Sequence, residues 1–262
     1  MSETTALEAD LLLMHVLKVS RAALLAAPER ILSATDITLL DTLVERRRDD
    51  VPLAYITGSQ PFWSLDLCVN SATLVPRADT ETLVEQALVR VAHHGPSRVA
   101  DLGTGSGAIA LAIACERPDA TIIASDTSPA ALDVARDNAQ RHDLRNVSFC
   151  ASHWLDNFDH GLFDVIVSNP PYVESGYAEL ERSLRHEPRV ALASGADGLD
   201  DIRHIVAQAP AYLASGGWLL LEHGNEQAVA VSGILRAADF CEVSTYLDLA
   251  GNPRVTEARF TR

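Results

Sequence analysis

The chain of 262 residues predicts an α/β fold with a mainly parallel sheet, preceded by a small helical domain. From residue 78 onward, short apolar runs alternate with helical stretches, an alternation that requires parallel strands joined by crossover helices. Before residue 51 the apolar residues follow helical spacing instead, and prolines with an alternating run then indicate a β-hairpin. We therefore expect a helical domain at 1–50, a β-hairpin linker at 51–75 and an α/β domain at 76–262.

The first 50 residues are predicted to contain helices only. Leu7, Leu11 and Met14 follow helical spacing in the first helix. A later helix is expected to begin after Asp36 as its N-cap and to end at the basic run 46–48, since cations are favoured at a helix C-terminus. The other interpretation of this basic run is a contact with RNA or with an acidic partner.

The strands and helices of the α/β domain follow from apolar runs and their flanking breakers. Strands are predicted at 98–102, 121–125, 147–150, 163–168, 218–221, 243–246 and 255–260. Helices are predicted at 79–91, 108–116, 129–142, 200–213 and 226–238. The last two strands have no helix between them, so we expect an antiparallel pair at one edge of the sheet.

Charge and cysteine spacing exclude several classes of protein. The net charge of −15 argues against a protein that holds nucleic acid by phosphate neutralisation alone. The four cysteines are widely spaced and form no Cys-x-x-Cys pair, which favours reduced thiols over a zinc site or a disulfide framework. No signal peptide and no membrane-spanning run is recognisable. These features predict a soluble, cytoplasmic protein that does not bind a membrane.

A glycine-rich loop follows the first strand of the α/β domain. Its candidate ligand-binding residues are Gly103, Thr104, Gly105, Ser106 and Gly107. Glycines allow a tight turn and a close approach of a ligand to the backbone, but the spacing is neither that of a dinucleotide site nor that of a P-loop. Asp126 ends the next strand, where its carboxylate can accept hydrogen bonds from ribose hydroxyls. This pair of features fits NAD and S-adenosylmethionine equally well.

The tetrapeptide Asn169-Pro170-Pro171-Tyr172 ends a later strand and decides between these two cofactors. The Asn169 side chain and the Pro170 carbonyl offer two rigid hydrogen-bond acceptors, and Tyr172 offers a flat face for a planar group. Such a site suits a planar –NH2, whose nitrogen is a poor nucleophile in an amide. Two acceptors on its N–H groups would favour the pyramidal nitrogen that methyl transfer requires.

The chain resembles the bacterial release-factor glutamine methyltransferases, the HemK/PrmC family, over essentially its full length. The resemblance rests on these two motifs and on the following further stretches: 76–81, 187–188, 195–199, 222–224 and 251–254. One departure is Ala78, where the family usually has proline; alanine is compatible with the first turn of a helix. The resemblance implies a Rossmann-like methyltransferase fold, with residues 76–262 as its catalytic domain and 1–50 as a substrate-recognition domain.

The resemblance also implies a cofactor and a substrate. S-adenosylmethionine would have its methionine end bound by the glycine-rich loop, with Asp126 at its ribose and Trp154 near its adenine, and Asn169 would also belong to the cofactor-binding residues. S-adenosylhomocysteine would be the product, and no metal is expected. Asn169, Pro170, Pro171 and Tyr172 would bind the substrate, which is the glutamine of the Gly-Gly-Gln loop in class I peptide-chain release factors. Asn169, Pro170 and Tyr172 would be the catalytic residues.

Two other functions remain to be weighed against this hypothesis. An adenine amino-methyltransferase acting on DNA or RNA needs the same pair of acceptors around a flipped base. The acidic charge and the lack of a basic target-recognition segment count against it. A binding or scaffold protein with a methyltransferase-like fold would not need the intact motifs. We expect a monomer whose partners are release factors, without direct binding of nucleic acid.

Overall fold

The computed structural model describes two compact units of the chain, Met1–Ser59 and Gln60–Arg262. The described residues are 3–92, 96–156, 158, 161–176 and 184–261. The first unit therefore extends beyond residue 50, where the sequence predicted the helical domain to end. Among the described residues, no helix is both long enough and apolar enough to cross a lipid bilayer.

The first unit is built from helices that pack around a small apolar core. Its helices are α1 (Glu3–Leu17), α2 (Arg21–Ala26), α3 (Ala34–Arg48) and α4 (Leu53–Thr57). The buried side chains of the core are Leu12, Val16, Leu43 and Ile56. The prediction that Asp36 is an N-cap was wrong: Ser33 is the N-cap of α3, and Asp36 completes a capping box three positions later.

The basic run at the end of α3 forms ion pairs within the first unit. Arg47 forms two hydrogen bonds with Glu8 of α1, at 2.9 and 3.1 Å. Arg48 pairs with Glu45 on the same helix, at 2.5 Å. All three arginines lie in the last turn of α3, where a positive charge complements the helix dipole. These contacts support the structural interpretation of the run.

The hairpin is shorter than the predicted linker. Strands β1 (Ser59–Phe62) and β2 (Leu65–Cys68) form a two-stranded sheet, and α4 occupies part of the segment that the sequence assigned to the hairpin. Asn138 of α7 (Pro129–Arg141) accepts a hydrogen bond from the Cys68 N–H at 2.7 Å. Its amide group also donates to the carbonyls of Cys68 and Ser106. One buried asparagine thus connects β2 to the glycine-rich loop.

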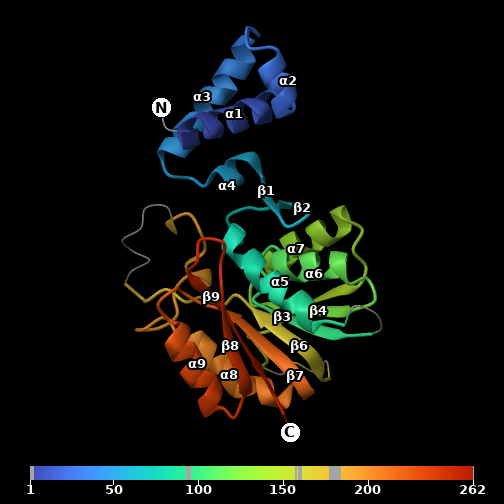
Figure 1. Cartoon of the computed structure of the whole chain (residues 1–262). Helices are drawn as coiled ribbons and strands as arrows, with labels where there is room; N and C mark the ends of the chain where they lie inside the picture. Colours follow the sequence, from blue (N-terminus) through green and yellow to red (C-terminus); the bar gives the residue numbers. More distant parts are fainter. Residues whose placement is uncertain (1–2, 93–95, 157, 159–160, 177–183, 262) are drawn as a thin grey trace. The chain divides into compact units, whose positions relative to one another are not determined.

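The second unit contains a mainly parallel sheet of seven strands (Figure 1). Its strands are β3 (Arg98–Leu102), β4 (Thr121–Asp126), β5 (Val147–Ala151), β6 (Phe163–Ser168), β7 (Leu213–Glu222), β8 (Cys241–Leu247) and β9 (Pro253–Arg259). The spatial order is β5-β4-β3-β6-β7-β9-β8, and the first five strands run parallel. The order reverses between β3 and β6, which is the place where α/β sheets bind ligands.

The final two strands form the antiparallel pair that the sequence predicted, with one difference. β9 lies between β7 and β8 and runs antiparallel to both. The antiparallel strand is therefore one position in from the edge, and the edge strand β8 runs in the direction of β7. The inserted position also buries β9, whose residues from Val255 to Ala258 are inaccessible to solvent or nearly so. The alternation of strands and helices predicts neither this insertion nor its burial.

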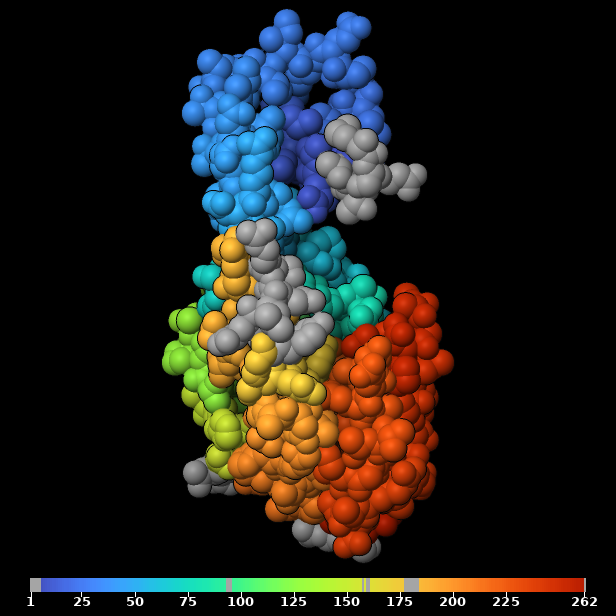
Figure 2. All heavy atoms as spheres, turned by 90° about the vertical axis from the view of Figure 1, so that its left-hand side faces the viewer, coloured from blue at the N-terminus to red at the C-terminus, as the bar shows by residue number. Residues whose placement is uncertain are grey.

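Helices cover both faces of the sheet. On one face lie α5 (Glu81–Arg90) and α6 (Ala108–Glu116), and their apolar side chains share a core with alternate strand residues such as Val99 and Val165. On the other face lie α8 (Asp200–Gln208) and α9 (Ala228–Ala237), which share a core with Ala100 and Ile166. Figure 2 shows the surface that these C-terminal segments form, coloured orange to red. Successive strand residues thus point to opposite layers.

Two short elements refine the predicted boundaries. The helix expected from residue 79 begins as a single 3-10 turn, Ala78–Thr80, which leads directly into α5. The helix expected to continue to Leu213 ends at Gln208, and after the turn Ala209–Ala211 the residue Leu213 already begins β7. Pro210 lies in that turn and prevents the helix from continuing.

Candidate active site

The glycine-rich loop turns sharply between β3 and α6. The N–H groups of Gly103 and Thr104 both donate to the Ser125 carbonyl, at 2.9 and 2.8 Å, and so fix the loop to the end of β4. Gly103 has a φ of +73°, and a Cβ atom there would lie 3.0 Å from the Trp154 ring. Gly105 has a φ of +55° and open space where its Cβ would lie. The loop therefore needs glycine at both positions because of its backbone conformation.

A buried carboxyl group lies beneath this loop. Asp101, at the end of β3, accepts hydrogen bonds on Oδ2 from the Thr104 hydroxyl at 2.6 Å and from the Ala110 N–H at 3.2 Å. Its Oδ1 has no hydrogen-bond partner among the described residues. Burial raises the pKa of Asp101 to about 7, although the Thr104 hydrogen bond opposes this shift. Asp101 thus links the glycine-rich loop to the first turn of α6.

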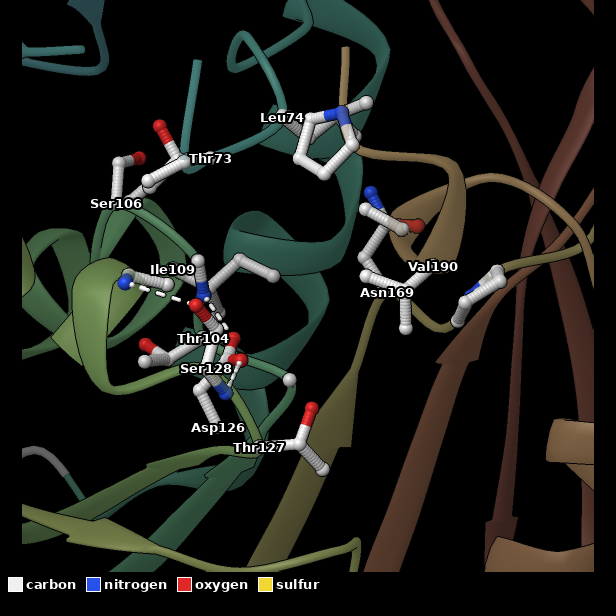
Figure 3. Close-up of a pocket in the computed structure, with 18 of the residues that line it drawn as sticks. Thr73, Leu74, Thr104, Ser106, Ile109, Asp126, Thr127, Ser128, Asn169 and Val190 are labelled. Atoms are coloured by element: carbon white, nitrogen blue, oxygen red, sulfur yellow. Dashed lines mark hydrogen bonds between the residues drawn. The ribbon is translucent and has the colours of Figure 1, made fainter. Parts of the chain in front are cut away.

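Asp126 presents a carboxylate at the end of β4. Its Oδ2 accepts from the Gly105 N–H and its Oδ1 from the Ser128 N–H, each at 2.9 Å. Figure 3 shows these bonds, with Asp126 and Asn169 on opposite sides of the cavity. Each carboxylate oxygen retains a second lone pair for a hydroxyl group of a ligand.

A cavity of about 390 Å³ lies over the carboxyl ends of β3, β4 and β6. It is lined by eight of the residues predicted for the site: Gly103, Thr104, Gly105, Ser106, Asp126, Trp154, Asn169 and Pro171. The other three predicted residues are Gly107, Pro170 and Tyr172, which do not line it. The two motifs are thus brought to one cavity, as their positions at the ends of neighbouring parallel strands predict.

Asn169 follows directly after β6, and its side chain is fixed by a hydrogen bond to the turn before α5. Its side-chain amide donates from Nδ2 to the Thr80 hydroxyl at 3.2 Å. Thr80 is buried and belongs to the 3-10 turn before α5. In this arrangement the Nδ2 group is engaged, and Oδ1 is the atom of the amide that remains for a ligand.

The comparisons with known proteins agree with this geometry. The family described as "Methyltransferase small domain" matches residues 78–197, and the "PrmC N-terminal domain" matches residues 2–58. A release factor glutamine methyltransferase of Xylella fastidiosa is 50% identical over 96% of this chain and 92% of its own length. The chain belongs to the release factor glutamine methyltransferase family. The family member of Escherichia coli is 45% identical over 99% of this chain and 94% of its own length.

The fold of this methyltransferase is also shared with a solved structure of low sequence identity. A methyltransferase from Pyrococcus furiosus superposes with a TM-score of 0.58 at 16% identity, covering 76% of this chain and 91% of its own. This likeness confirms the Rossmann-like methyltransferase fold that the sequence predicts.

Tyr172 of the methyltransferase is anchored by a carboxylate that the sequence analysis did not single out. The Tyr172 hydroxyl donates to Glu222 Oε1 at 3.3 Å, and the Tyr172 carbonyl accepts from the Gln227 amide at 3.0 Å. Burial raises the pKa of Tyr172, and the negative charge of Glu222 adds to this shift. The phenol therefore stays protonated. Gly198 packs so closely against the same loop that a Cβ atom there would lie 2.2 Å from the Tyr172 carbonyl oxygen.

A second buried carboxylate, Glu187, fixes the segment before α5. Its Oε2 accepts from the Val75 N–H at 3.0 Å, and its Oε1 forms an ion pair with Arg77. Glu187 is 4% exposed, whereas Arg77 is one of the residues that line the cavity. Glu187 and Arg77 lie 110 positions apart, so no local spacing in the sequence predicts their ion pair. The Glu-Pro dipeptide at 187–188 is the one signal that the sequence offers.

Trp154 is positioned by two contacts. Its indole N–H donates to Asp201 of α8 at 3.0 Å, and its ring packs over Gly103. Next to it lies the one group of described side chains with spacing suitable for a metal ion, His153, Asp156 and His204. The group is exposed, and its carboxylate already bonds to His153 and to the Gln208 amide.

His223, at the end of β7, is buried and has a structural environment. Its Nε2 lies 2.8 Å from the Thr256 hydroxyl and its Nδ1 lies 2.8 Å from the Gly224 carbonyl. Burial lowers the pKa of His223. A neutral imidazole that bonds to β9 on one side and to the following turn on the other fits a structural role.

Proposed function

We propose that this methyltransferase transfers a methyl group from S-adenosylmethionine to the side-chain amide nitrogen of the glutamine in the Gly-Gly-Gln loop of class I release factors. The observation that carries the proposal is the position of Asn169. Its amide borders the same cavity as the glycine-rich loop and Asp126, but on the opposite side. A cofactor on one wall and an amide substrate on the other would meet between them.

The residues of the cavity fit S-adenosylmethionine. Asp126 offers free lone pairs to two ribose hydroxyls, and the space beside Gly105 admits the methionine end of the molecule. Trp154 lines the same cavity and offers an aromatic surface to the adenine. When bound, the cofactor supplies a methyl group on a positively charged sulfur. We assign the loop residues 103–107, with Asp126, Trp154 and Asn169, to cofactor binding.

The substrate amide would be held by the tetrapeptide 169–172. Asn169 Oδ1 and the Pro170 carbonyl are acceptors for the two N–H groups of the glutamine side chain. Bonding both N–H groups directs the nitrogen lone pair toward the methyl group and favours the pyramidal form of the nitrogen. Pro171 stiffens the loop, and the bond of Tyr172 to Glu222 holds the end of the tetrapeptide in place.

The reaction needs no basic side chain in this motif. The nitrogen lone pair forms the new N–C bond while the S–C bond breaks, and its electron pair stays on sulfur to give S-adenosylhomocysteine. The methylated amide nitrogen is then cationic and strongly acidic, so its extra proton passes to water. The contribution of the chain is orientation and electrostatic stabilisation, which are effective because the acceptors are fixed before the substrate binds.

The helical unit Met1–Ser59 is the proposed site of release-factor recognition. It has a separate core, and its sequence matches the PrmC N-terminal domain. The large acidic charge of the chain disfavours nucleic acid as a partner. We further propose that the enzyme acts as a monomer in the cytoplasm and needs no metal.

The test uses labelled S-adenosylmethionine and a purified class I release factor. One sample contains the natural factor, and its matched control carries alanine in place of the loop glutamine. An Asn169→Ala enzyme is assayed in parallel after its binding of S-adenosylmethionine has been verified. We expect label on the natural factor only, and a loss of labelling on the order of 10²-fold with Asn169→Ala. No label on either factor, or label on an oligonucleotide instead, would refute the proposal.

A further inference from the structure

A buried polar cluster joins two residues of the proposed substrate site, Asn169 and Tyr172, to groups outside that site. Its central group is Glu222, the last residue of β7, which is 1% exposed. The Glu222 carboxylate accepts from the Tyr172 hydroxyl on Oε1 at 3.3 Å, and its Oε2 is buried without a hydrogen-bond partner among the described residues. The Thr80 side chain is close enough to lower the pKa of Glu222. Thr80 in turn accepts from the Asn169 amide. Three segments far apart in the sequence thus bring a buried carboxylate close to the amide that borders the cavity.

The chemistry of these three groups allows only one direction of hydrogen bonding. An ionised carboxylate accepts hydrogen bonds and cannot donate, so a hydrogen bond between Thr80 and Glu222 must use the single proton of the Thr80 hydroxyl. The hydroxyl oxygen can then only accept from Asn169, which must present its NH2 group to Thr80. The Asn169 Oδ1 atom is consequently left for the cavity. If Thr80 donated to Asn169 instead, the amide would turn and present NH2 to the substrate NH2, a contact between two donors.

We propose that Glu222, acting through Thr80, fixes the orientation of the Asn169 amide and so makes it a hydrogen-bond acceptor for the substrate. Glu222 is thus a positioning residue and does not touch substrate or cofactor. The inference rests on the proposed function for its meaning in catalysis, but the orientation of the amide is a structural property that can be measured separately.

The surroundings of Glu222 make its charge dependent on pH. The charged and titratable groups around it are Arg254 of β9, Asp79 of the turn before α5 and Tyr172. Burial raises the pKa of Glu222 to about 7, against the opposing effects of Thr80 and Arg254. Arg254 is shared with two other carboxylates, because it also forms ion pairs with Asp248 at 3.0 Å and with Asp79 at 3.3 Å.

This position predicts a loss of turnover at acidic pH. A protonated Glu222 can donate to Thr80, which frees the hydroxyl proton for Asn169 and allows the amide to turn. We expect kcat of the natural enzyme to fall as the pH drops below about 7, and the affinity for S-adenosylmethionine to remain unchanged over the same range. A merely structural role of Glu222 would produce no such separation of kcat from binding.

The first experiment is a double-mutant cycle on turnover. Thr80→Val removes the hydroxyl, and Glu222→Met removes the carboxylate at similar volume; each should lower kcat on the order of 10²-fold without changing cofactor affinity. The two losses should not add in the double variant, because both act through one hydrogen bond. Thr80→Ser should keep turnover near that of the natural enzyme. Thr82→Val, which removes a neighbouring buried hydroxyl, is the matched control.

The second experiment is independent of activity and uses neutron diffraction on a deuterium-exchanged crystal. This method distinguishes the oxygen of the Asn169 amide from its deuterated amino group. We expect Nδ2 toward Thr80 in the natural enzyme and a reversed or mixed amide in Glu222→Met. Thermal unfolding verifies that each variant is folded. The same amide orientation in both proteins, or additive losses in the cycle, would overturn the proposal. A natural enzyme that methylates no release factor would refute the proposed function instead, and the neutron result would still decide the orientation.

Discussion

Replacement of Asp126 by asparagine tests the cofactor wall of the cavity most directly. In the structure both carboxylate oxygens accept a backbone N–H at 2.9 Å, from Gly105 and from Ser128. Asparagine keeps only one acceptor, so its NH2 group must face one of these N–H donors. A hydrogen bond to a charged group contributes about 1.5–3 kcal/mol, and we expect the free energy of unfolding to fall by about 2 kcal/mol.

The same substitution removes one acceptor for the ribose of S-adenosylmethionine. The loss of one such bond corresponds to a dissociation constant raised about 10- to 100-fold. Because the ribose bonds are equal in the ground state and the transition state, kcat at saturating cofactor should change little. Isothermal titration calorimetry measures the binding, and denaturant unfolding measures the stability.

The matched control for this experiment is Asp133→Asn on α7. Asp133 is 75% exposed and, among the residues that the structure describes, pairs with Arg136 one turn away, so both measured quantities should stay close to those of the natural enzyme. A change of less than twofold in the dissociation constant of Asp126→Asn would show that Asp126 does not contact the ribose. A large fall in kcat with unchanged affinity would contradict the assignment equally.

Three further predictions concern the same unit. Gly103→Ala should weaken cofactor binding, because a Cβ would press on Trp154 and the left-handed backbone costs alanine about 1–2 kcal/mol. If the substitution lowers the melting temperature by the same amount with and without cofactor, Gly103 has no role in the site. Asp101 has a pKa of about 7 in the folded protein against an ordinary value of 3.8, so its favourable contribution is present below about pH 4 and is lost as the pH rises through 7. Asp101→Asn should therefore flatten the dependence of stability on pH between about 4 and 7 in denaturant unfolding, and an unchanged slope would refute the shift. Glu257→Gln should lower the free energy of unfolding by about 3–5 kcal/mol, because it leaves the partly buried Arg90 without its bidentate partner; equal midpoints in urea would exclude this.

The mainly parallel pairing of the sheet could be predicted from the sequence because its strands and most of the helices between them are marked locally, whereas the insertion of β9 could not. Apolar runs such as 163–168 read as buried strands, and the alternation with helices dictates parallel pairing. The short helix α4 was missed because its five residues are too few to show a helical period. Gly58 ends this helix in a left-handed conformation, and the glycine at this position is a local signal that could have indicated the helix end.

The two motifs of the site were found for the same reason, since each lies within one strand-to-loop junction. The groups that hold them in place were not found. Glu222 and Glu187 bond to residues far away in the sequence, and an isolated glutamate at a strand end or before a proline has many possible roles. Their buried, bonded state is a property of tertiary packing, which no local spacing records. The orientation of the Asn169 amide depends on that packing too.

The reversal of strand order between β3 and β6 gives the loops of the two halves of the active site different supporting groups. The loops after β3 and β4 are braced by each other, through Ser125 and Asp126. The tetrapeptide after β6 is braced instead by the 3-10 turn before α5 and by β7, through Thr80 and Glu222. Since the two halves share few partners, substitutions made on opposite sides should combine additively in free energy, whereas those within one half should not. An engineer could therefore redesign the acceptor side for another amide while leaving the methyl-donor side as it is.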